Sequence, residues 1–346
     1  MRDLRALPKA ELHVHLEGSL RVETARELSA LRGRPLPGGL SSAGWSLDPP
    51  FDGPMDFIDQ YVATCGLLVE PEDFRRLAIE FCEDLSREGV RYAETVFSPS
   101  NHARRLGDDW FGPIEAVLDG LAFGEREHGV TVRLTPDVVR DLGVEEGERV
   151  LEVAIKFAGR GVVALNAAGS ERSAIEPFAP LFRRAKDAGL RSVPHAGEWA
   201  GPGNVWETLM SYDPDRIGHG VRSIEDPELV AHLAERRIPL EVSPVSNVAT
   251  GGYASLAEHP FVALRDAGII VTLNSDDPTM FGAWLGDVFE QARAAWGLTD
   301  AELARIAAAG VEASFAPDAI KRELLDGIQE WLEAPAGSDE GTGRPA

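Results

Sequence analysis

The residues best suited to metal chemistry are two histidines near the start of the chain. His13 and His15 are one residue apart in the apolar stretch Glu11-Leu-His-Val-His-Leu-Glu17. Side chains alternate along a β-strand with a period of two, so both imidazoles project from the same face. Buried imidazoles need polar partners, and a shared metal ion supplies one. A histidine pair satisfied by ordinary hydrogen bonds at a strand end is the alternative interpretation.

Two later apolar segments end in further histidines. His195 closes the run 191–195, which places it to join the first pair as a metal ligand, and Glu198 follows on the rim, where an acid would meet a substrate. His219 stands between Gly218 and Gly220, which free the backbone and leave space beside the ring. This suits a general base or an orienting histidine. A structural histidine bonded to a backbone carbonyl is the alternative for His219, and a surface acid is the alternative for Glu198.

The last apolar run, 269–273, is followed by the adjacent acids Asp276 and Asp277. Like charges this close are costly unless a cation neutralises one, so we expect one carboxylate to ligate metal and the other to face a substrate. An Asx turn before Pro278 would explain only one of the two. Three histidines and a carboxylate, with one position open for water, suit a single Zn²⁺. Zinc lowers the pKa of bound water to about 7.

The elements that must position these residues alternate between strand and helix. We predict strands at 11–16, 90–97, 131–139, 161–165, 191–195, 216–219, 238–242 and 269–273, and helices that include 71–88, 147–158, 175–188, 227–237 and 260–267. Such alternation implies parallel pairing through right-handed crossovers, and eight units close an α/β barrel of the (β/α)8 TIM type. A doubly wound open sheet fits less well, because polar residues end nearly all the strands and not only those at one switch point.

Two segments fall outside the repeat. Residues 22–66, rich in proline and glycine, predict an insertion of short helices and loops after the first strand, placed over the barrel mouth as a lid. Residues 334–346 contain almost no large apolar side chain and predict a disordered tail. Residues 1–333 then form a single metal-dependent hydrolase domain.

Composition limits the partners and the compartment. The net charge of −23 disfavours nucleic acid and anionic membrane surfaces, which attract basic proteins. Two cysteines cannot build a disulfide framework, and the sequence shows neither a signal peptide nor a membrane span, so we expect a cytoplasmic protein. The composition does not indicate the oligomeric state. Four further histidines are interpreted as surface residues: His102, with the least support, His128, His232 and His259.

Taken together, these motifs resemble the adenosine deaminase family of metal-dependent aminohydrolases. The matching motifs, in family order from Leu7 to about Leu325, are His13-Val-His15-Leu-Glu-Gly18, Tyr92-Ala-Glu94 with Ser98-Pro99, His195-Ala-Gly-Glu198, Arg216-Ile-Gly-His219-Gly220, Ser243-Pro-Val-Ser-Asn247 and Ser275-Asp276-Asp277-Pro278. Any one of them is weak, whereas the ordered set is highly specific.

The resemblance implies a role for each matching residue. His13, His15, His195 and Asp276 are then the zinc ligands. Glu198 would protonate N1 of a purine and so make C6 electrophilic. His219 would orient or deprotonate the attacking water, Asp277 would hold that nucleophile and help to place the ring, and Gly169 would give its backbone N–H to N3. Attack at C6 then expels ammonia.

The sequence departs from the family pattern on the ribose side. Glu17 stands where adenosine deaminases usually have an aspartate that contacts the ribose 5′ hydroxyl, and Ser170 replaces an acid after Gly169. The resemblance therefore implies adenosine or deoxyadenosine as the default substrate, aminodeoxyfutalosine, an adenosine derivative changed at its 5′ side, as the second, and free adenine as the third. A purine sensor and a hydrolase of another amide or imine are alternatives that ammonia release and a substrate panel would separate.

Two other kinds of metal site are disfavoured. A binuclear amidohydrolase centre needs a lysine at the end of the fourth strand, and Gly161-Val-Val-Ala-Leu-Asn166 has none. The cytidine-deaminase type of zinc site needs a Cys-x-x-Cys pair, which the sequence lacks.

Overall fold

The strands form a closed parallel barrel. The computed structural model describes residues 1–41, 44–45 and 51–335. Hydrogen bonds join the strands in the orders β1-β4-β5-β6-β7 and β8-β9-β10-β11, every pair parallel. These strands are β1 (Lys9–His15), β4 (Val90–Phe97), β5 (Thr131–Val139), β6 (Ala164–Ala168), β7 (Arg191–Ser192), β8 (His195–Ala196), β9 (Ile217–His219), β10 (Leu240–Val242) and β11 (Val271–Leu273).

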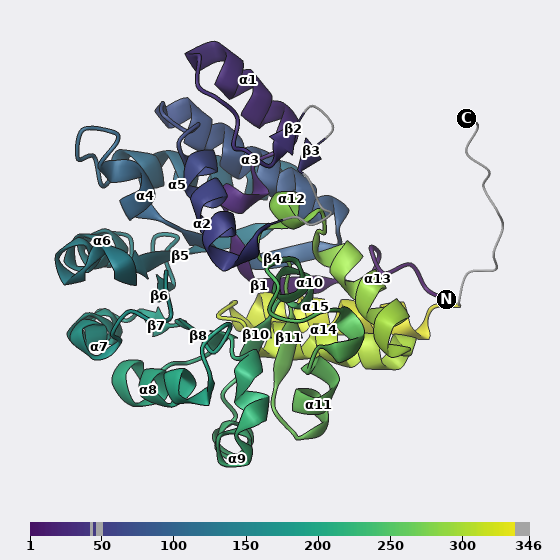
Figure 1. The fold of residues 1–346 in the computed structure, drawn as a ribbon. Coiled ribbons are helices and arrows are strands. Elements are labelled where there is room, and N and C mark those ends of the chain that lie inside the picture. The colour runs from purple at the N-terminus through teal and green to yellow at the C-terminus, as the bar shows by residue number, and fades with distance from the viewer. Residues whose placement is uncertain (42–43, 46–50, 336–346) are drawn as a thin grey trace.

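The barrel closes between its first and last strands. The N–H of His15 donates to Asp276 O at 2.7 Å, and the N–H of Asp276 donates to His13 O at 3.1 Å. β7 and β8 are two short pieces of one predicted strand, so eight strand positions surround the axis, as the sequence predicts (Figure 1). This closure puts the ends of β1 and β11, and the polar residues on them, side by side.

Helices surround the barrel (Figure 1). They are α3 (Pro71–Arg87), α4 (Pro99–Ala103), α5 (Gly112–His128), α6 (Val144–Lys156), α7 (Ala179–Asp187), α8 (Pro202–Tyr212), α9 (Pro227–Arg236), α10 (Pro244–Ala249), α11 (Phe261–Asp266), α12 (Pro278–Phe281), α13 (Leu285–Trp296), α14 (Asp300–Ala313) and α15 (Asp318–Glu333). Short 3-10 turns are η1 (Glu17–Ser19), η2 (Arg140–Leu142), η3 (Glu176–Phe178), η4 (Val221–Glu225) and η5 (Leu256–Glu258).

α3 shows why these segments become helices. A capping box between Glu70 and Asp73 opens it, with Pro71 in the first turn. Phe74, Leu77 and Phe81 then recur at helical spacing and are almost fully buried. Such an apolar stripe buries one side of the helix against the barrel.

The segment after β1 departs from the repeat as predicted. It holds α1 (Val22–Arg32), the short antiparallel pair β2 (Leu40–Ser41) and β3 (Gly44–Trp45), and α2 (Gly53–Cys65). α2 lies near the strand ends that carry the polar residues (Figure 1). Motion of this segment as a lid stays a prediction. The predicted tail lies outside the described residues from 336 onward.

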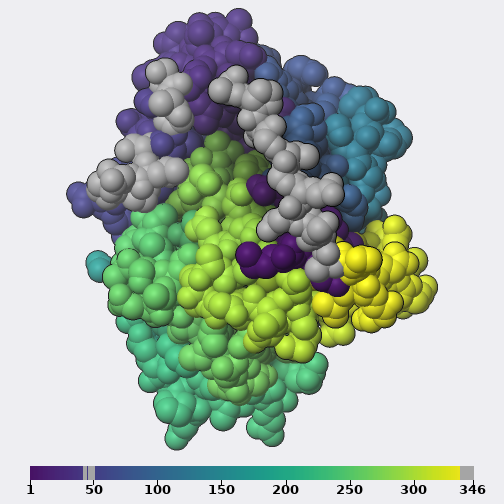
Figure 2. Space-filling view, turned by 90° about the vertical axis from the view of Figure 1, so that its right-hand side faces the viewer, coloured from purple at the N-terminus to yellow at the C-terminus, as the bar shows by residue number. Residues whose placement is uncertain are grey.

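Both ends of the described chain meet on one face. Arg2 Nε donates to Trp331 O at 2.9 Å, and Trp331 Nε1 donates to Asp3 O at 2.9 Å. The first residues therefore lie against α15 (Figure 2). No helix among the described residues combines the length and apolar character needed to cross a bilayer.

Two predictions about positions were wrong. The fourth strand begins at Ala164, because Gly161 adopts a left-handed φ of 115° and Val162 makes only isolated bridges. His102 and His259, predicted to lie at the surface, are 0% and 5% exposed. Each has polar partners inside the fold, which hydropathy along the chain does not reveal.

Candidate active site

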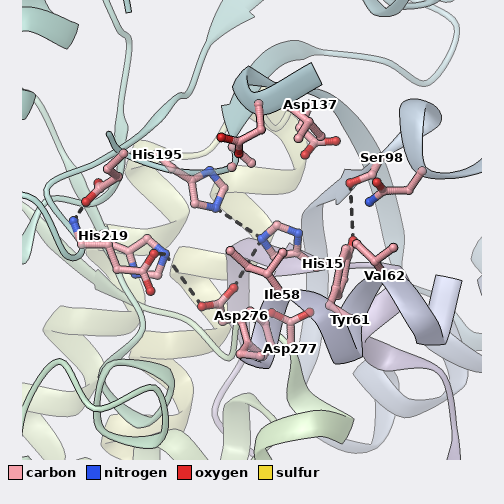
Figure 3. A pocket seen from close by; sticks show the side chains of 18 of the residues that line it. His15, Ile58, Tyr61, Val62, Ser98, Asp137, His195, His219, Asp276 and Asp277 are labelled. Atoms are coloured by element: carbon pink, nitrogen blue, oxygen red, sulfur yellow. Dashed lines mark hydrogen bonds and ion pairs between the residues drawn. The ribbon is translucent and has the colours of Figure 1, made fainter. Parts of the chain in front are cut away.

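Three histidines and one carboxylate converge where β1, β8 and β11 end. Nε2 of His15 lies 3.3 Å from Nε2 of His195, and Asp276 Oδ1 lies 3.4 Å from His15 Nε2 and 3.6 Å from His13 Nε2. The side chains of His15, His195 and Asp276 point toward one another (Figure 3). Ligands about 2.1 Å from a tetrahedral ion lie about 3.4 Å apart, so this spacing suits a shared metal ion.

Hydrogen bonds fix which ring nitrogens face this centre. His13 Nδ1 lies 3.0 Å from Glu241 Oε2, and His195 Nδ1 lies 2.9 Å from Asn166 Oδ1. Both partners are acceptors, so each Nδ1 carries the proton and each Nε2 presents a lone pair to the centre. His13 Nε2 is buried and has no hydrogen-bond partner. This donor set fits a divalent ion such as Zn²⁺.

A buried arginine supports the carboxylate behind His13. Arg216 Nε donates to Glu241 Oε1 at 2.6 Å, and the other side of the guanidinium pairs with Glu94. All three side chains are at most 1% exposed. Burial of charge is tolerated where the groups pair and hydrogen-bond in this way. The network therefore holds Glu241, and through it the ring of His13, in one orientation.

A chain of hydrogen bonds sets the proton position on His219. The backbone N–H of Phe261 donates to His259 Nδ1 at 3.2 Å, so His259 Nε2 donates to Asn247 Oδ1 at 3.1 Å. The Asn247 amide then donates to His219 Nδ1 at 3.2 Å. Burial lowers the pKa of His219 to about 3. His219 is thus neutral, with its proton on Nε2.

Glu198 lies beside His219. The distance from Glu198 Oε2 to His219 Nε2 is 3.5 Å. Burial, and then the charges of Asp276, Glu171 and Asp277, raise the pKa of Glu198 well above its usual value. A carboxylic acid that keeps its proton at neutral pH can act as a general acid.

The two adjacent aspartates have opposite environments. Burial and the negative charge of Asp276 raise the pKa of Asp277 well above its usual value. Burial acts on Asp276 in the same direction, but its contact with His13 Nε2 at 3.6 Å and the neighbouring histidines hold its pKa well below that value. Asp276 (φ 65°) and His219 (φ 59°) both adopt the left-handed region, a strained conformation typical of functional sites.

Glu171 clamps the loop that carries the acid. Its Oε1 accepts the N–H of Glu198 at 2.9 Å, and its Oε2 accepts the N–H of Trp199 at 2.8 Å and that of Ala200. Sequence reasoning gave Glu171 no role. Its geometry makes it a positioning residue, because one carboxylate fixes three successive amides of the loop.

Glycines leave room for two site residues. A Cβ on Gly18 would lie 1.8 Å from Asp277 Oδ1, and one on Gly218 would lie 2.8 Å from His13 Cε1. No larger side chain fits at Gly18 without displacing the aspartate. Sequence motifs include both glycines, but this steric reason appears only in three dimensions.

A cavity of about 110 Å³ opens beside the centre. Of the predicted site residues, His15, Gly169, His195, Glu198, His219, Asp276 and Asp277 line it. Phe57, Ile58, Tyr61 and Val62 of α2 form its outer wall. Glu17, predicted to contact substrate, is instead 0% exposed beneath this wall, where its Oε1 accepts the N–H of Ser98 at 2.9 Å and lies 3.0 Å from His102 Nε2.

Comparison with known proteins agrees with this geometry. The adenosine deaminase family model matches residues 8–331. The chain belongs to the adenosine deaminase family. An aminodeoxyfutalosine deaminase of Streptomyces coelicolor is 40% identical over 96% of this chain and 87% of its own.

Solved structures extend the match. The adenine deaminase of Arthrobacter aurescens is 32% identical with a TM-score of 0.87, covering 95% of this chain and all of its own. An amidohydrolase from Burkholderia ambifaria with bound Zn is 27% identical with a TM-score of 0.86, covering 95% and 92%. The predictions of the family, of the barrel and of an enzyme of the deaminase type are confirmed. Metal dependence is typical of the family.

Proposed function

We propose that this chain is a zinc-dependent aminohydrolase that removes the 6-amino group of an uncharged adenine-ring compound. The convergence of His13, His15, His195 and Asp276 beside Glu198, a buried acid whose pKa is raised, carries the proposal. One Zn²⁺ held by these four residues would supply a water of lowered pKa as the nucleophile. The other residues of the site would transfer protons and orient the substrate.

Each catalytic side chain has a task that its geometry supports. Glu198 donates its proton to ring N1, which makes C6 electrophilic. His219 donates from Nε2 and so holds the attacking oxygen toward C6, a role of orientation and not of proton removal. Asp277 lines the cavity with Oδ1 unpaired, placed to hold the nucleophile and the ring. Addition of water at C6 and loss of ammonia leave a 6-oxopurine.

The charged groups that line the cavity limit the range of possible substrates. Six carboxyl groups line it: Asp137, Asp141, Glu171, Glu198, Asp276 and Asp277. No lysine or arginine stands among its described lining residues. Exposed Arg105 donates to the backbone carbonyls of Val62 and Asn101, which belong to the wall. An anionic substituent such as a phosphate would lose its hydration here without gaining a cationic partner among these residues, which costs binding energy.

Among uncharged substrates, free adenine, adenosine and deoxyadenosine all fit this description. Glu17 is buried against His102 and Ser98, so a contact between Glu17 and a ribose 5′ hydroxyl requires rearrangement. This weakens the case for adenosine and favours free adenine as the first substrate to test. Aminodeoxyfutalosine, which carries a carboxylate remote from the purine ring, is the second candidate, because a relative 40% identical to this chain is named for its deamination.

Ammonia release by the zinc-loaded protein tests the proposal. The panel is adenine, adenosine, deoxyadenosine, aminodeoxyfutalosine and AMP. We expect turnover of an uncharged member with kcat/KM at least about 100-fold above that for AMP, given the several kcal/mol that burial of an unpaired anion costs. Preferred turnover of AMP would contradict the charge argument, and the absence of ammonia from every substrate would contradict the proposed function.

A further inference from the structure

A buried acid without a full set of partners stands at the end of the cavity remote from His219. Asp137 lies near the C-terminal end of β5, is 2% exposed, and lines the cavity. Its Oδ1 has no hydrogen-bond partner. Asp137, Ser98 and Tyr61 lie on one side of the pocket, and His219 lies on the other (Figure 3).

The surroundings of Asp137 offer few donors. Ser98 Oγ and Tyr61 Oη are 3.4 Å apart, and the neighbouring wall of α2 is otherwise apolar, with Phe57, Ile58 and Val62. Burial, and then the charge of Glu17, raise the pKa of Asp137 to about 8, although a hydrogen bond from Ser98 acts in the opposite direction. An ionised carboxylate can accept about four hydrogen bonds, and a buried acceptor left unpaired is costly.

The orientation of the purine decides what reaches Asp137. This step rests on the proposed function, in which C6 faces the metal centre and N1 faces Glu198. The opposite edge of the ring, with N9 and any sugar attached to it, then points away from Glu198 and His219. That edge therefore faces the end of the cavity where Asp137 lies.

We propose that Asp137 is a specificity-determining residue that accepts a hydrogen bond from a donor on the N9 side of the substrate. In free adenine this donor is the N9–H, and in a nucleoside it is a sugar hydroxyl. Either donor satisfies Oδ1, which no described side chain or backbone group does. Ser98 and Tyr61 complete a small polar patch within the apolar wall.

The test compares Asp137→Asn with the wild type on three compounds: adenine, adenosine, and adenine methylated at N9. The third compound has neither an N9–H nor a sugar. Asp187→Asn, at the exposed end of α7, is the matched control. At about pH 9, above the pKa of Asp137, we expect Asp137→Asn to lose about 10- to 100-fold in kcat/KM with the compound that donates to the carboxylate, the usual effect of removing a hydrogen bond to a charged group. The N9-methyl compound should change by less than about threefold, within the range of context effects on a site that keeps its contacts.

The outcomes separate the two sources of the donor. A loss confined to adenine assigns the N9–H, and a loss confined to adenosine assigns a sugar hydroxyl. An equal loss on all three compounds would mean that Asp137 has only a structural role and would overturn the proposal. The absence of any loss would overturn it too.

Thermal unfolding distinguishes specificity from a structural role. Burial of a carboxylate is costly, so Asp137→Asn should leave the unfolding midpoint unchanged or raise it. A lowered midpoint combined with unselective loss would support a structural role. Asp137→Ser keeps a hydroxyl near Ser98 but removes the carboxylate. If the carboxylate determines specificity, this variant must lose kcat/KM on the same compounds as Asp137→Asn.

Binding measurements test this inference independently of the proposed function. Titration calorimetry of the three compounds in a Glu198→Gln background measures the contribution of Asp137 without turnover. A selective weakening of binding there supports the inference even if the wild type releases no ammonia. Equal affinities with and without Asp137→Asn in that background would overturn it.

Discussion

The two ends of the cavity are built on different principles. At the metal end, His13, His195 and His219 each have the ring nitrogen remote from the centre held by a second side chain: Glu241, Asn166 and Asn247. At the far end, Asp137 has an oxygen without a partner and faces an apolar wall. The histidine rings at the first end are held from behind by other side chains, whereas Oδ1 of Asp137 at the second end lacks a donor.

This difference separates chemistry from substrate selection. Preorganised groups cost no reorganisation when charge develops in a reaction, so the metal end suits catalysis on any compatible ring. Unsatisfied acceptors acquire their partners only when a ligand arrives, so the far end suits discrimination between ligands. Substitutions at the two ends should therefore change different kinetic constants.

The largest expected effect at the metal end belongs to the acid. Glu198→Gln keeps the size of the side chain but removes the proton that N1 needs. We expect kcat to fall by about 10²- to 10⁴-fold, the usual contribution of general acid catalysis, while zinc content stays at the wild-type level. Steady-state ammonia release and metal analysis check this. Glu207→Gln, exposed on α8, is the matched control, and an active Glu198→Gln enzyme would remove the acid from the mechanism.

A smaller effect should follow from removal of the support behind a ligand. Glu241→Gln leaves His13 in place but weakens the acceptor that orients its ring. We expect zinc affinity to fall by about 10- to 100-fold, as is usual for the outer partner of a ligating histidine. Competition with a chelator measures this affinity. Full activity of the variant at saturating zinc is expected, and unchanged affinity would show that the Arg216 network does not act on the metal site.

Much of the site could be predicted because each residue follows a strand. His195 and His219 end apolar runs, and parallel strands of a barrel bring such ends to one face. β4 and β5 were predicted with their observed bounds, because both are long and rich in apolar and β-branched residues. To predict that the histidines and Asp276 converge, only the order of the strands was needed. The alternation of strands and helices along the sequence gives that order.

The supporting residues could not be found in the same way. Glu241 is an acid inside an apolar strand, a signal of a buried partner, but the sequence does not say that the partner is His13. His102 lies in the short helix α4, where a surface position is the usual expectation, yet it pairs with Glu17 in the interior. Such pairings depend on distances across the barrel, and no local pattern encodes them.

The smallest expected effect concerns Glu171, and it tests which end of the cavity this residue serves. Glu171 lines the cavity but acts through backbone amides of the Glu198 loop, so it belongs to the metal end by function. Glu171→Gln should lower kcat by roughly 10-fold, because a small misplacement of a catalytic group is enough for such a loss, and Glu171→Ala should lower it further. KM should change little, since the substrate contacts at the far end remain.

Steady-state kinetics of both variants against Glu176→Ala, an exposed acid of the same segment, measure this split. If Glu171 had a role only in folding, both variants would yield less active enzyme. Their kcat values would then be equal when compared at equal zinc content. A rise in KM with unchanged kcat would instead place Glu171 among the groups that bind substrate. The Glu198 loop would then contribute both to catalysis and to substrate selection, and selection would not be limited to the end of the cavity that holds Asp137.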